Sequence, residues 1–226
     1  MAVQPIAWSH SRISDFKKCP RMFYEKNITK SVPFEQTPAM LEGDRVHKML
    51  DKRVSEKVPF PHGYQYLEPV AQVIDSLPGQ TFTEMRMTLA PDLTPTGYFA
   101  PDAYVRVIID VAKVFGKQAW LGDYKTGKVT MDVEQLKLFS AVAFHHWPDV
   151  QETHASYVYL NAKVIDGKTY HRDELPKLWE ELLQEPQRLQ EHAAANHWPV
   201  RPGRHCRWCA VNKHRKCPSP GEPYRD

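Results

Sequence analysis

Two short apolar runs, residues 104–111 and 119–125, constrain the fold of this chain more than any other feature. They read Y-V-R-V-I-I-D-V and A-W-L-G-D-Y-K, with the β-branched and apolar content typical of central strands. The turn F-G-K-Q joins them, and so short a link predicts an antiparallel hairpin. Each run nevertheless carries an acid, Asp110 in the first and Asp123 in the second.

These acids predict a site for charge chemistry. Strand alternation places Lys125 on the same face as Asp123. Unpaired carboxylates are costly on strands this apolar, so they require a charge partner or an ion. Two carboxylates beside a lysine suit a hard divalent cation, with the ammonium placed to hold a water or to meet negative charge on phosphate. A surface ion pair at a strand end is the alternative that these residues leave open.

The rest of the chain predicts an α/β fold around a mixed sheet. Helical spacing or capping signals predict helices over residues 9–19, 39–57, 65–76, 132–147 and 173–196, the last interrupted by Pro186. Period-two alternation, typical of a strand, begins at Thr81, and a further strand follows at 155–160. Asp166-Gly167 predicts a two-residue hairpin turn after that strand. Glu84, on the strand that follows Thr81, is a further acid that could approach the predicted site.

Length and composition predict one globular domain. The chain has 226 residues, of which 42% are hydrophobic and 25% charged, and a formal charge of +3 permits a polyanionic partner without requiring one. We expect a single domain over 1–226, with an N-terminal helical part (1–80), a sheet core (81–172) and a C-terminal helix with a cysteine-rich tail (173–226). No apolar stretch is long enough to span a membrane and no basic leader is present, so a cytoplasmic location is expected.

The four cysteines predict a metal centre. Cys206 and Cys209 form a C-x-x-C pair and Cys217 is followed by proline, while Cys19 lies near the opposite end of the chain. In a reducing compartment this arrangement favours metal ligation over disulfides. Three late thiolates leave a fourth position open, which Cys19 can fill.

Taken together, the motifs resemble those of RecB-type nucleases of the PD-(D/E)XK superfamily. That pattern contains a G-x-x-x-H helix, an acid on one strand, D/E-x-K on the next strand and a helix with Q-x-x-x-Y. In this sequence the counterparts occur in the same order, as Gly43 to His47, Ile109-Asp110, Gly122-Asp123-Tyr124-Lys125 and Gln135 to Phe139. The resemblance covers most of the chain.

The resemblance implies a role for each matching residue. His47, Asp110, Asp123 and the main-chain carbonyl of Tyr124 would bind magnesium or manganese. Lys125 would activate or orient the attacking water, and Gln135 would brace the site or the substrate phosphate.

Two of these residues also have structural interpretations. His47 could be an ordinary helix histidine, and Gln135 could close a capping box with Asp132. Phe139 departs from the family tyrosine, so the function of that hydroxyl is lost or supplied elsewhere.

The implied fold is a restriction-endonuclease-like mixed sheet flanked by helices, with the N- and C-terminal segments joined by a metal cluster. The implied activity is metal-dependent hydrolysis of DNA by an exonuclease that acts on single strands or ends. A helicase or recombination protein could be a partner, and the pathway stays open among phage recombination, repair and CRISPR adaptation. The alternative is a nucleic-acid-binding module that does not cleave.

The cysteine pattern is similar to that of iron-sulfur nucleases, among them AddB and the CRISPR-associated adaptation exonucleases. By that resemblance Cys19, Cys206, Cys209 and Cys217 would hold a [4Fe-4S] cluster. Zinc is the rival, bound either by the same thiolates or with His205 or His214 in place of Cys19.

Two further patterns bear on function. Residues 122–128 read G-x-x-x-x-G-K, but Val129 replaces the hydroxyl residue of a P-loop, which argues against an NTPase. Near the late cysteines, cations interleave with tryptophans, as in surfaces that bind single strands, although a solvated basic tail has the same composition. These residues are Arg201, Arg204, Arg207, Lys213, Arg215 and Lys216, with Trp198 and Trp208.

Overall fold

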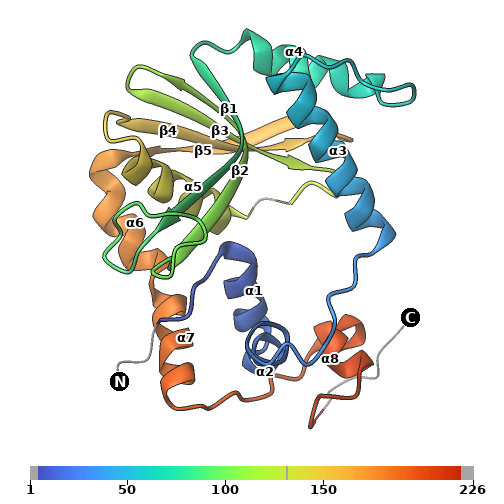
Figure 1. Ribbon diagram of the computed structural model, residues 1–226, viewed down its shortest axis with the longest axis vertical. Helices are drawn as coiled ribbons and strands as arrows, with labels where there is room; N and C mark the ends of the chain where they lie inside the picture. Colours follow the sequence, from blue (N-terminus) through green and yellow to red (C-terminus); the bar gives the residue numbers. More distant parts are fainter. Residues whose placement is uncertain (1–4, 131, 220–226) are drawn as a thin grey trace. The chain divides into compact units, whose positions relative to one another are not determined.

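The computed structural model describes residues 5–130 and 132–219, and the chain divides into two compact units (Figure 1). One unit is continuous, Thr37–Glu181, and the other combines Met1–Gln36 with Leu182–Asp226. No helix among the described residues is long and apolar enough to cross a membrane. Whether the two units act as one nuclease domain stays a prediction.

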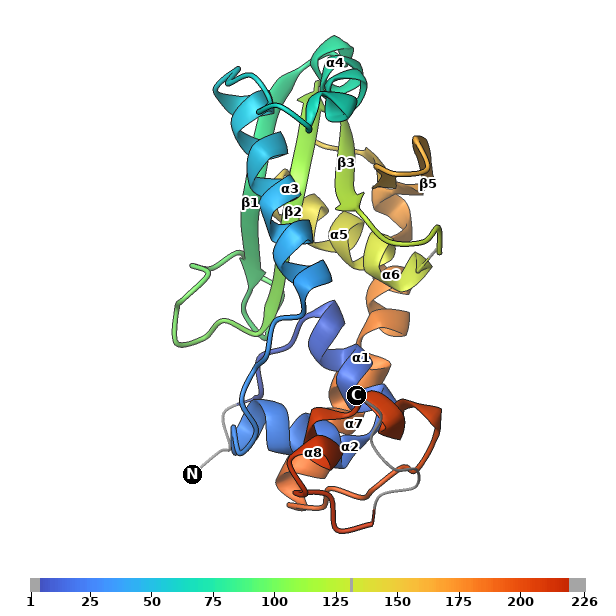
Figure 2. The same cartoon turned by 90° about the vertical axis from the view of Figure 1, so that its right-hand side faces the viewer.

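A five-stranded mixed sheet forms the centre of the continuous unit. Its strands follow the order of the chain, and all neighbours are antiparallel except β3 and β4, which are parallel. The strands are β1 (Gln80–Leu89), β2 (Val105–Phe115), β3 (Gln118–Lys125), β4 (Glu152–Tyr159) and β5 (Val164–His171). Helices lie on both sides of this sheet (Figures 1 and 2), which confirms the predicted α/β fold.

The β2–β3 hairpin has the predicted antiparallel pairing. Val111 lies opposite Gly122, and this register brings Asp110 and Asp123 onto neighbouring strands one position further along. Gly122 is required by packing, because a Cβ there would lie 2.6 Å from the Trp120 ring and 2.8 Å from Val111.

Three helices of this unit carry the predicted spacing. Helix α3 (Pro38–Ser55) begins at Pro38 with Thr37 as N-cap, α4 (Glu68–Ser76) follows a short 3-10 turn, η2 (Gln65–Leu67), and α5 (Val133–His146) begins after the N-cap Asp132. Helices α3 and α4 bury their apolar faces in one core with strands of the sheet. Its members include Val46, Leu50, Val54, Leu67, Ala71, Ile74, Val111, Tyr124 and Val158.

The predicted Asp166-Gly167 turn is wrong. Both residues lie inside β5, where Gly167 pairs with Ser156, and the chain reverses earlier, at residues 160–163, with Lys163 at φ 54°. A Cβ at Gly167 would lie 2.4 Å from the Ala155 carbonyl oxygen. The glycine therefore serves close strand packing, a role that a local Asp-Gly pattern cannot distinguish from a turn.

The second unit is mainly helical. Its elements are α1 (His10–Lys18), α2 (Pro20–Phe23), the π-helical η1 (Tyr24–Ile28), α7 (Gln184–Ala194), η4 (Arg204–Trp208) and α8 (Ala210–Lys213). Gln190 exchanges two hydrogen bonds with the backbone of Ile6, and Phe16 packs edge-on against His192 at 5.3 Å. The early and late segments of the chain are thereby joined.

The predicted interruption in residues 173–196 is present, although Pro186 does not mark it. After η3 (Arg172–Glu174), α6 (Leu175–Leu182) ends before Leu183, and Pro186 lies in the first turn of α7. Proline is tolerated there because the first turn of a helix has no partner for its N–H groups.

Candidate active site

The two strand acids are buried side by side. Asp110 and Asp123 are 7% and 6% exposed. Burial raises the pKa of Asp123 to about 6, and the negative charge of Asp110 adds to the shift, while Lys125 opposes it. The two carboxylates are therefore close enough for their charges to repel, and Lys125 compensates this repulsion only in part.

Asp110 is held from two directions. Its Oδ2 accepts a hydrogen bond of 2.7 Å from the Tyr124 backbone N–H, and its Oδ1 lies 3.4 Å from His47 Nδ1 on α3. Burial alone lowers the pKa of His47, but the hydrogen bond and charge of Asp110 outweigh that effect, so the pKa is raised. The structure thus places His47 next to Asp110, which favours a role in the site over that of an ordinary helix histidine.

Tyr124 separates the two acids along the chain. Its side chain is buried in the core and its ring lies edge-on to His47, with centroids 5.6 Å apart. Its backbone N–H donates the hydrogen bond to Asp110 described above. A role for its carbonyl in metal binding stays a prediction.

Lys125 lies against Asp123, as strand alternation predicted. Its Nζ is 2.5 Å from Asp123 Oδ2 and 3.4 Å from Gln135 Oε1, and it stands 5.0 Å from the ring centroid of Tyr157. About a third of its side chain is exposed. The ammonium is therefore positioned by three neighbours and still accessible from solvent.

Gln135 belongs to the site and not to a capping box. Its Nε2 donates to Asp123 Oδ1 at 3.1 Å, while Asp132, the N-cap of α5, accepts from the Glu134 N–H. Phe139, one turn further along α5, is buried and offers no hydroxyl.

Tyr157 on β4 supplies a hydroxyl that the sequence analysis missed. Its O–H group contacts Gln135 Oε1 at 2.9 Å and the Asp132 carbonyl oxygen at 2.8 Å. It pairs with Asp123 across the parallel β3–β4 ladder. Only that pairing, which follows a helical crossover, brings Tyr157 to Gln135, so the local pattern gave no signal for it.

Glu84 also reaches the acids. His47, Glu84 and Asp110 each offer a ligand atom, and these atoms lie within 4.8 Å of one another. Glu84 interrupts the β1–β2 ladder between the pairs Thr83–Val111 and Met85–Ile109, with φ at 47°. Such a backbone is uncommon for a residue other than glycine. Burial raises the pKa of Glu84, and the negative charges of Asp110 and Asp51 raise it further.

The donor set fits a hard divalent cation. Carboxylate oxygens are the ligands that magnesium and manganese prefer, and one imidazole is compatible with manganese. Asp123 Oδ2 is a buried oxygen that lies against the Lys125 ammonium. A cation would offset the mutual repulsion of the acids.

The P-loop alternative does not fit this geometry. Gly122 lies within β3 and Gly127 lies just beyond its end, whereas α5 begins only at Val133. The segment therefore does not lead directly into a helix N-terminus, as a phosphate-binding loop does.

The four cysteines converge within the other unit. Cys19, Cys209 and Cys217 share one small core with Met22 and Val211. Burial raises the pKa of the Cys209 thiol, backbone N–H groups of Asn212 and Val211 oppose the shift, and Cys19 and Cys206 contribute as neighbouring charges.

Backbone amides point at these sulfurs. The Arg201 N–H donates to Cys19 Sγ and the Gly203 N–H to Cys206 Sγ, both at 3.4 Å. Such N–H···S contacts stabilise thiolates and are one means by which proteins tune metal-sulfur centres. Backbone amides thus lie against two of the four sulfurs, while metal binding by the four thiolates stays a prediction.

The basic residues around the cysteines have mixed surroundings. Lys213 and His214 both pair with Glu35, and Trp198 stacks on Tyr24 at 5.0 Å. Trp208 is 67% exposed. Lys213 and Trp198 therefore have structural partners, and Trp208 keeps an open face.

Comparison with known proteins decides the family. Residues 7–214 match the PD-(D/E)XK nuclease superfamily. The chain belongs to this superfamily. It is therefore a nuclease, and the catalytic roles of the acids and the lysine stay predictions. No curated protein sequence matches the chain.

Two solved structures are similar to this PD-(D/E)XK chain. A Eubacterium rectale protein whose crystal structure bears the name "putative exonuclease" is 12% identical, with a TM-score of 0.54 over 97% of this chain and 91% of that one. The crystal structure of SSO0001 is 15% identical, with a TM-score of 0.49 over 96% of this chain and 88% of that one. At such low identity, the E. rectale structure supports the fold alone.

The Tyr157 hydroxyl provides a test of how the site is held. We expect Tyr157→Phe to reduce DNA cleavage roughly tenfold, because Gln135 loses the group that orients it and a small misplacement near reacting atoms is costly. The lost hydrogen bonds should also lower the free energy of unfolding by about 1–2 kcal/mol. Initial cleavage rates and urea unfolding measure the two effects.

Tyr159→Phe is the matched control. Its hydroxyl binds the Thr130 backbone and not Gln135. It should destabilise the protein to a similar degree and leave cleavage near the parent rate. Equal cleavage by the two variants would contradict a positioning role for Tyr157.

Proposed function

We propose that this nuclease is a magnesium- or manganese-dependent deoxyribonuclease that works as an exonuclease on single strands or DNA ends. The observation that carries the proposal is the convergence of two buried carboxylates, Asp110 and Asp123, with the ammonium of Lys125. This combination serves phosphodiester hydrolysis, which needs a positioned water and cationic groups near the reacting phosphate.

The ligands of the metal would be His47, Asp110, Asp123 and the Tyr124 carbonyl, and Glu84 adds an oxygen donor within reach of the first two. When bound, such a cation supplies an activated water and neutralises charge on the leaving oxygen. The protein fixes these donors on three strands and one helix, so little reorganisation is needed on binding.

Lys125 and Gln135 would act on the water and the phosphate. The Lys125 ammonium is partly exposed, so it can hold a water by hydrogen bonding or meet the charge that develops on phosphate. Gln135 binds both Asp123 and Lys125, and therefore keeps the carboxylate and the ammonium in register.

The exonuclease mode rests on the RecB-type order of the motifs, from Gly43 and His47 to Gln135. The name borne by the E. rectale neighbour agrees with it. DNA is the proposed partner, and a helicase or recombination protein would supply unwinding where duplex is the substrate.

We also propose that Cys19, Cys206, Cys209 and Cys217 hold a [4Fe-4S] cluster with a structural role. Support comes from their convergence in one unit and from the backbone amides directed at three of the sulfurs. Zinc with the same four thiolates is the second candidate, since both centres accept tetrahedral sulfur ligands.

A module that binds nucleic acid without cleaving it is the competing function. Binding alone gains little from acids that face phosphate, because the two charges repel. The retention of Asp110, Asp123 and Lys125 in one buried cluster therefore favours catalysis.

Cleavage of end-labelled linear DNA with manganese tests the proposed activity. Lys125→Ala should cut at least about 100-fold more slowly, because it removes a charge from the reacting phosphate. Lys163→Ala, at an exposed turn, is the matched control and should cleave like the parent. A closed circle of single-stranded DNA should resist digestion. Equal cleavage by the two lysine variants would reject the assigned chemistry, and rapid cutting of the circle would reject the exonuclease mode.

Thermal unfolding tests the metal site independently of cleavage. Manganese should raise the melting temperature of the parent, since a ligand at 100 times its Kd stabilises by about 2.7 kcal/mol. Asp110→Asn should lose this shift, because it removes a charged ligand. Asp166→Asn, at an exposed position of β5, should retain it. A full manganese shift in Asp110→Asn would place the ion elsewhere.

Anaerobic purification followed by iron, sulfide and zinc analysis tests the cysteine centre. We expect a brown protein with about four irons per chain. Cys19→Ser should lose iron, whereas His205→Ala should keep it, since the histidine matters only for a local zinc knuckle. A colourless parent that contains zinc would overturn the iron-sulfur proposal.

A further inference from the structure

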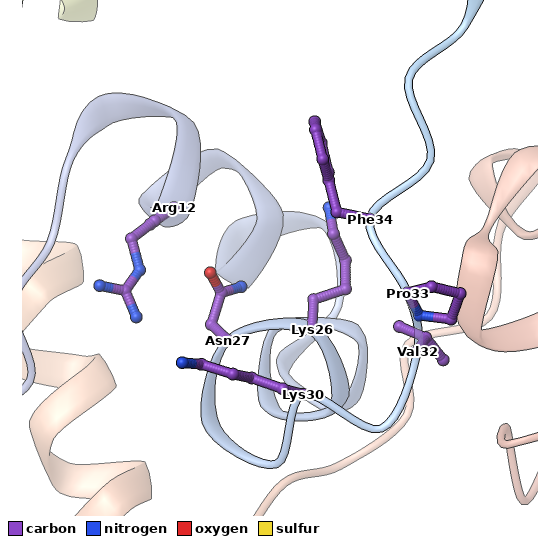
Figure 3. A pocket seen from close by; sticks show the side chains of 7 residues that line it. All are labelled: Arg12, Lys26, Asn27, Lys30, Val32, Pro33 and Phe34. Atoms are coloured by element: carbon purple, nitrogen blue, oxygen red, sulfur yellow. The ribbon is translucent and has the colours of Figure 1, made fainter.

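A pocket of about 660 Å³ is lined by residues among the first 36 of the chain, in the unit that does not contain Asp110 and Asp123 (Figure 3). Its volume is in the range typical of ligand sites. It is lined by Arg12, Lys26, Asn27, Lys30, Val32, Pro33 and Phe34.

The pocket has a cationic side and an apolar side. In Figure 3, Arg12, Asn27 and Lys30 lie on one side, while Phe34, Pro33 and Val32 lie on the other. No acid is among the lining residues. The pocket therefore suits a ligand that combines a negative group with a flat apolar one.

The partners of these cations leave positive charge in the pocket. Lys26 pairs with Asp15. Arg12 lies over the Phe23 ring at 5.7 Å. Lys30 is exposed, and its ammonium has no ion pair among the residues that the structure describes.

Phe34 is the second unusual feature. Its side chain is 75% exposed although it stands beside three cationic residues of the pocket. An exposed aromatic ring flanked by cations is the combination with which proteins hold unpaired bases, since the ring stacks on the base and the cations contact the phosphates.

The pocket wall is fixed before a ligand binds. The Asn27 amide donates to the Phe23 carbonyl oxygen at 3.2 Å, and the Ser31 N–H donates to the Glu25 carbonyl oxygen at 3.0 Å. Lys30 lies between these anchors with φ at 50°, so its backbone direction is set by the turn. A preorganised wall reduces the entropy lost on binding.

We propose that this pocket binds one nucleotide of a single DNA strand, with the base stacked on Phe34 and the phosphate held by Lys30. The choice of DNA as ligand rests on the proposed function. A base within a duplex is already stacked on both faces, so the pocket discriminates in favour of unpaired strands.

Binding of a fluorescent oligothymidylate to the full chain in EDTA tests this site without cleavage. Lys30→Glu should weaken binding about tenfold and reduce the slope of log K against log salt by about 0.7, the contribution of one phosphate contact on a single strand. Phe34→Ala should weaken binding about five- to tenfold, as expected for one lost stacking contact.

Matched variants exist for both positions. Lys163→Glu reverses another exposed lysine at positive φ, and Phe115→Ala removes another exposed ring, 60% exposed. Both controls should bind the strand like the parent. With a blunt duplex of equal length, Phe34→Ala should also equal the parent, because no unpaired base is offered.

Binding by Lys30→Glu and Phe34→Ala that equals their controls overturns the proposal, as does a parent that binds no strand. An equal loss on duplex and single strand overturns base stacking. Circular dichroism verifies the fold, and Lys30→Gln and Phe34→Leu replace any variant that unfolds. The binding assay in EDTA is independent of cleavage. A parent that binds through the pocket but fails the separate cleavage assay would therefore reject the proposed deoxyribonuclease activity and leave the proposed nucleotide pocket standing.

Discussion

The opposition of Asp110 and Asp123 is the constraint on which the site depends. Two like charges are buried on adjacent strands because the β2–β3 register aligns Val111 with Gly122. Apolar strands gain stability by burial, and each acid opposes that gain unless its charge is compensated. The surrounding contacts provide this compensation, because the Tyr124 N–H donates to Asp110 and the Lys125 ammonium lies against Asp123. The raised pKa of Asp123 shows that protein groups alone leave the compensation incomplete. A bound cation would complete it, so the same burial that costs stability would create affinity for an ion.

Residues outside the β2–β3 hairpin hold Asp123 and Lys125 in place. Gln135 links Asp123 to Lys125, and Tyr157 in turn fixes Gln135 and the start of α5. Tyr157 on β4 therefore supplies a hydroxyl to Gln135, while the buried Phe139 on α5 offers none. The site is thus a property of the β3–α5–β4 crossover as a whole. The parallel pairing of β3 with β4 sets the distance between its parts.

The sequence predicted the site residues that depend on short-range structure. Strand alternation and a short hairpin suffice to bring Asp110, Asp123 and Lys125 together, and the order of the motifs added His47 and Gln135. Tyr157 could not be predicted, since its position follows from pairing between strands separated by a helix. The placement of Glu84 depends on a positive φ, which strand alternation does not predict. The turn prediction at Gly167 was wrong because a glycine needed for close packing has the same local pattern as one needed for a turn.

The cysteine unit poses a different physical problem, because its two segments are separated by the whole of the sheet unit in the sequence. The contacts that join them include the exposed pairing of Lys213 with Glu35, the hydrogen bonds between Gln190 and Ile6, and a small core shared by Met22 and Val211. Exposed ion pairs contribute little. The cysteines are divided one to three between the same segments, so a metal centre that takes all four as ligands joins them covalently. Closing so long a loop removes much of the entropy of the unfolded chain. A metal centre bound by all four cysteines would therefore have a structural role by topology, without any redox step.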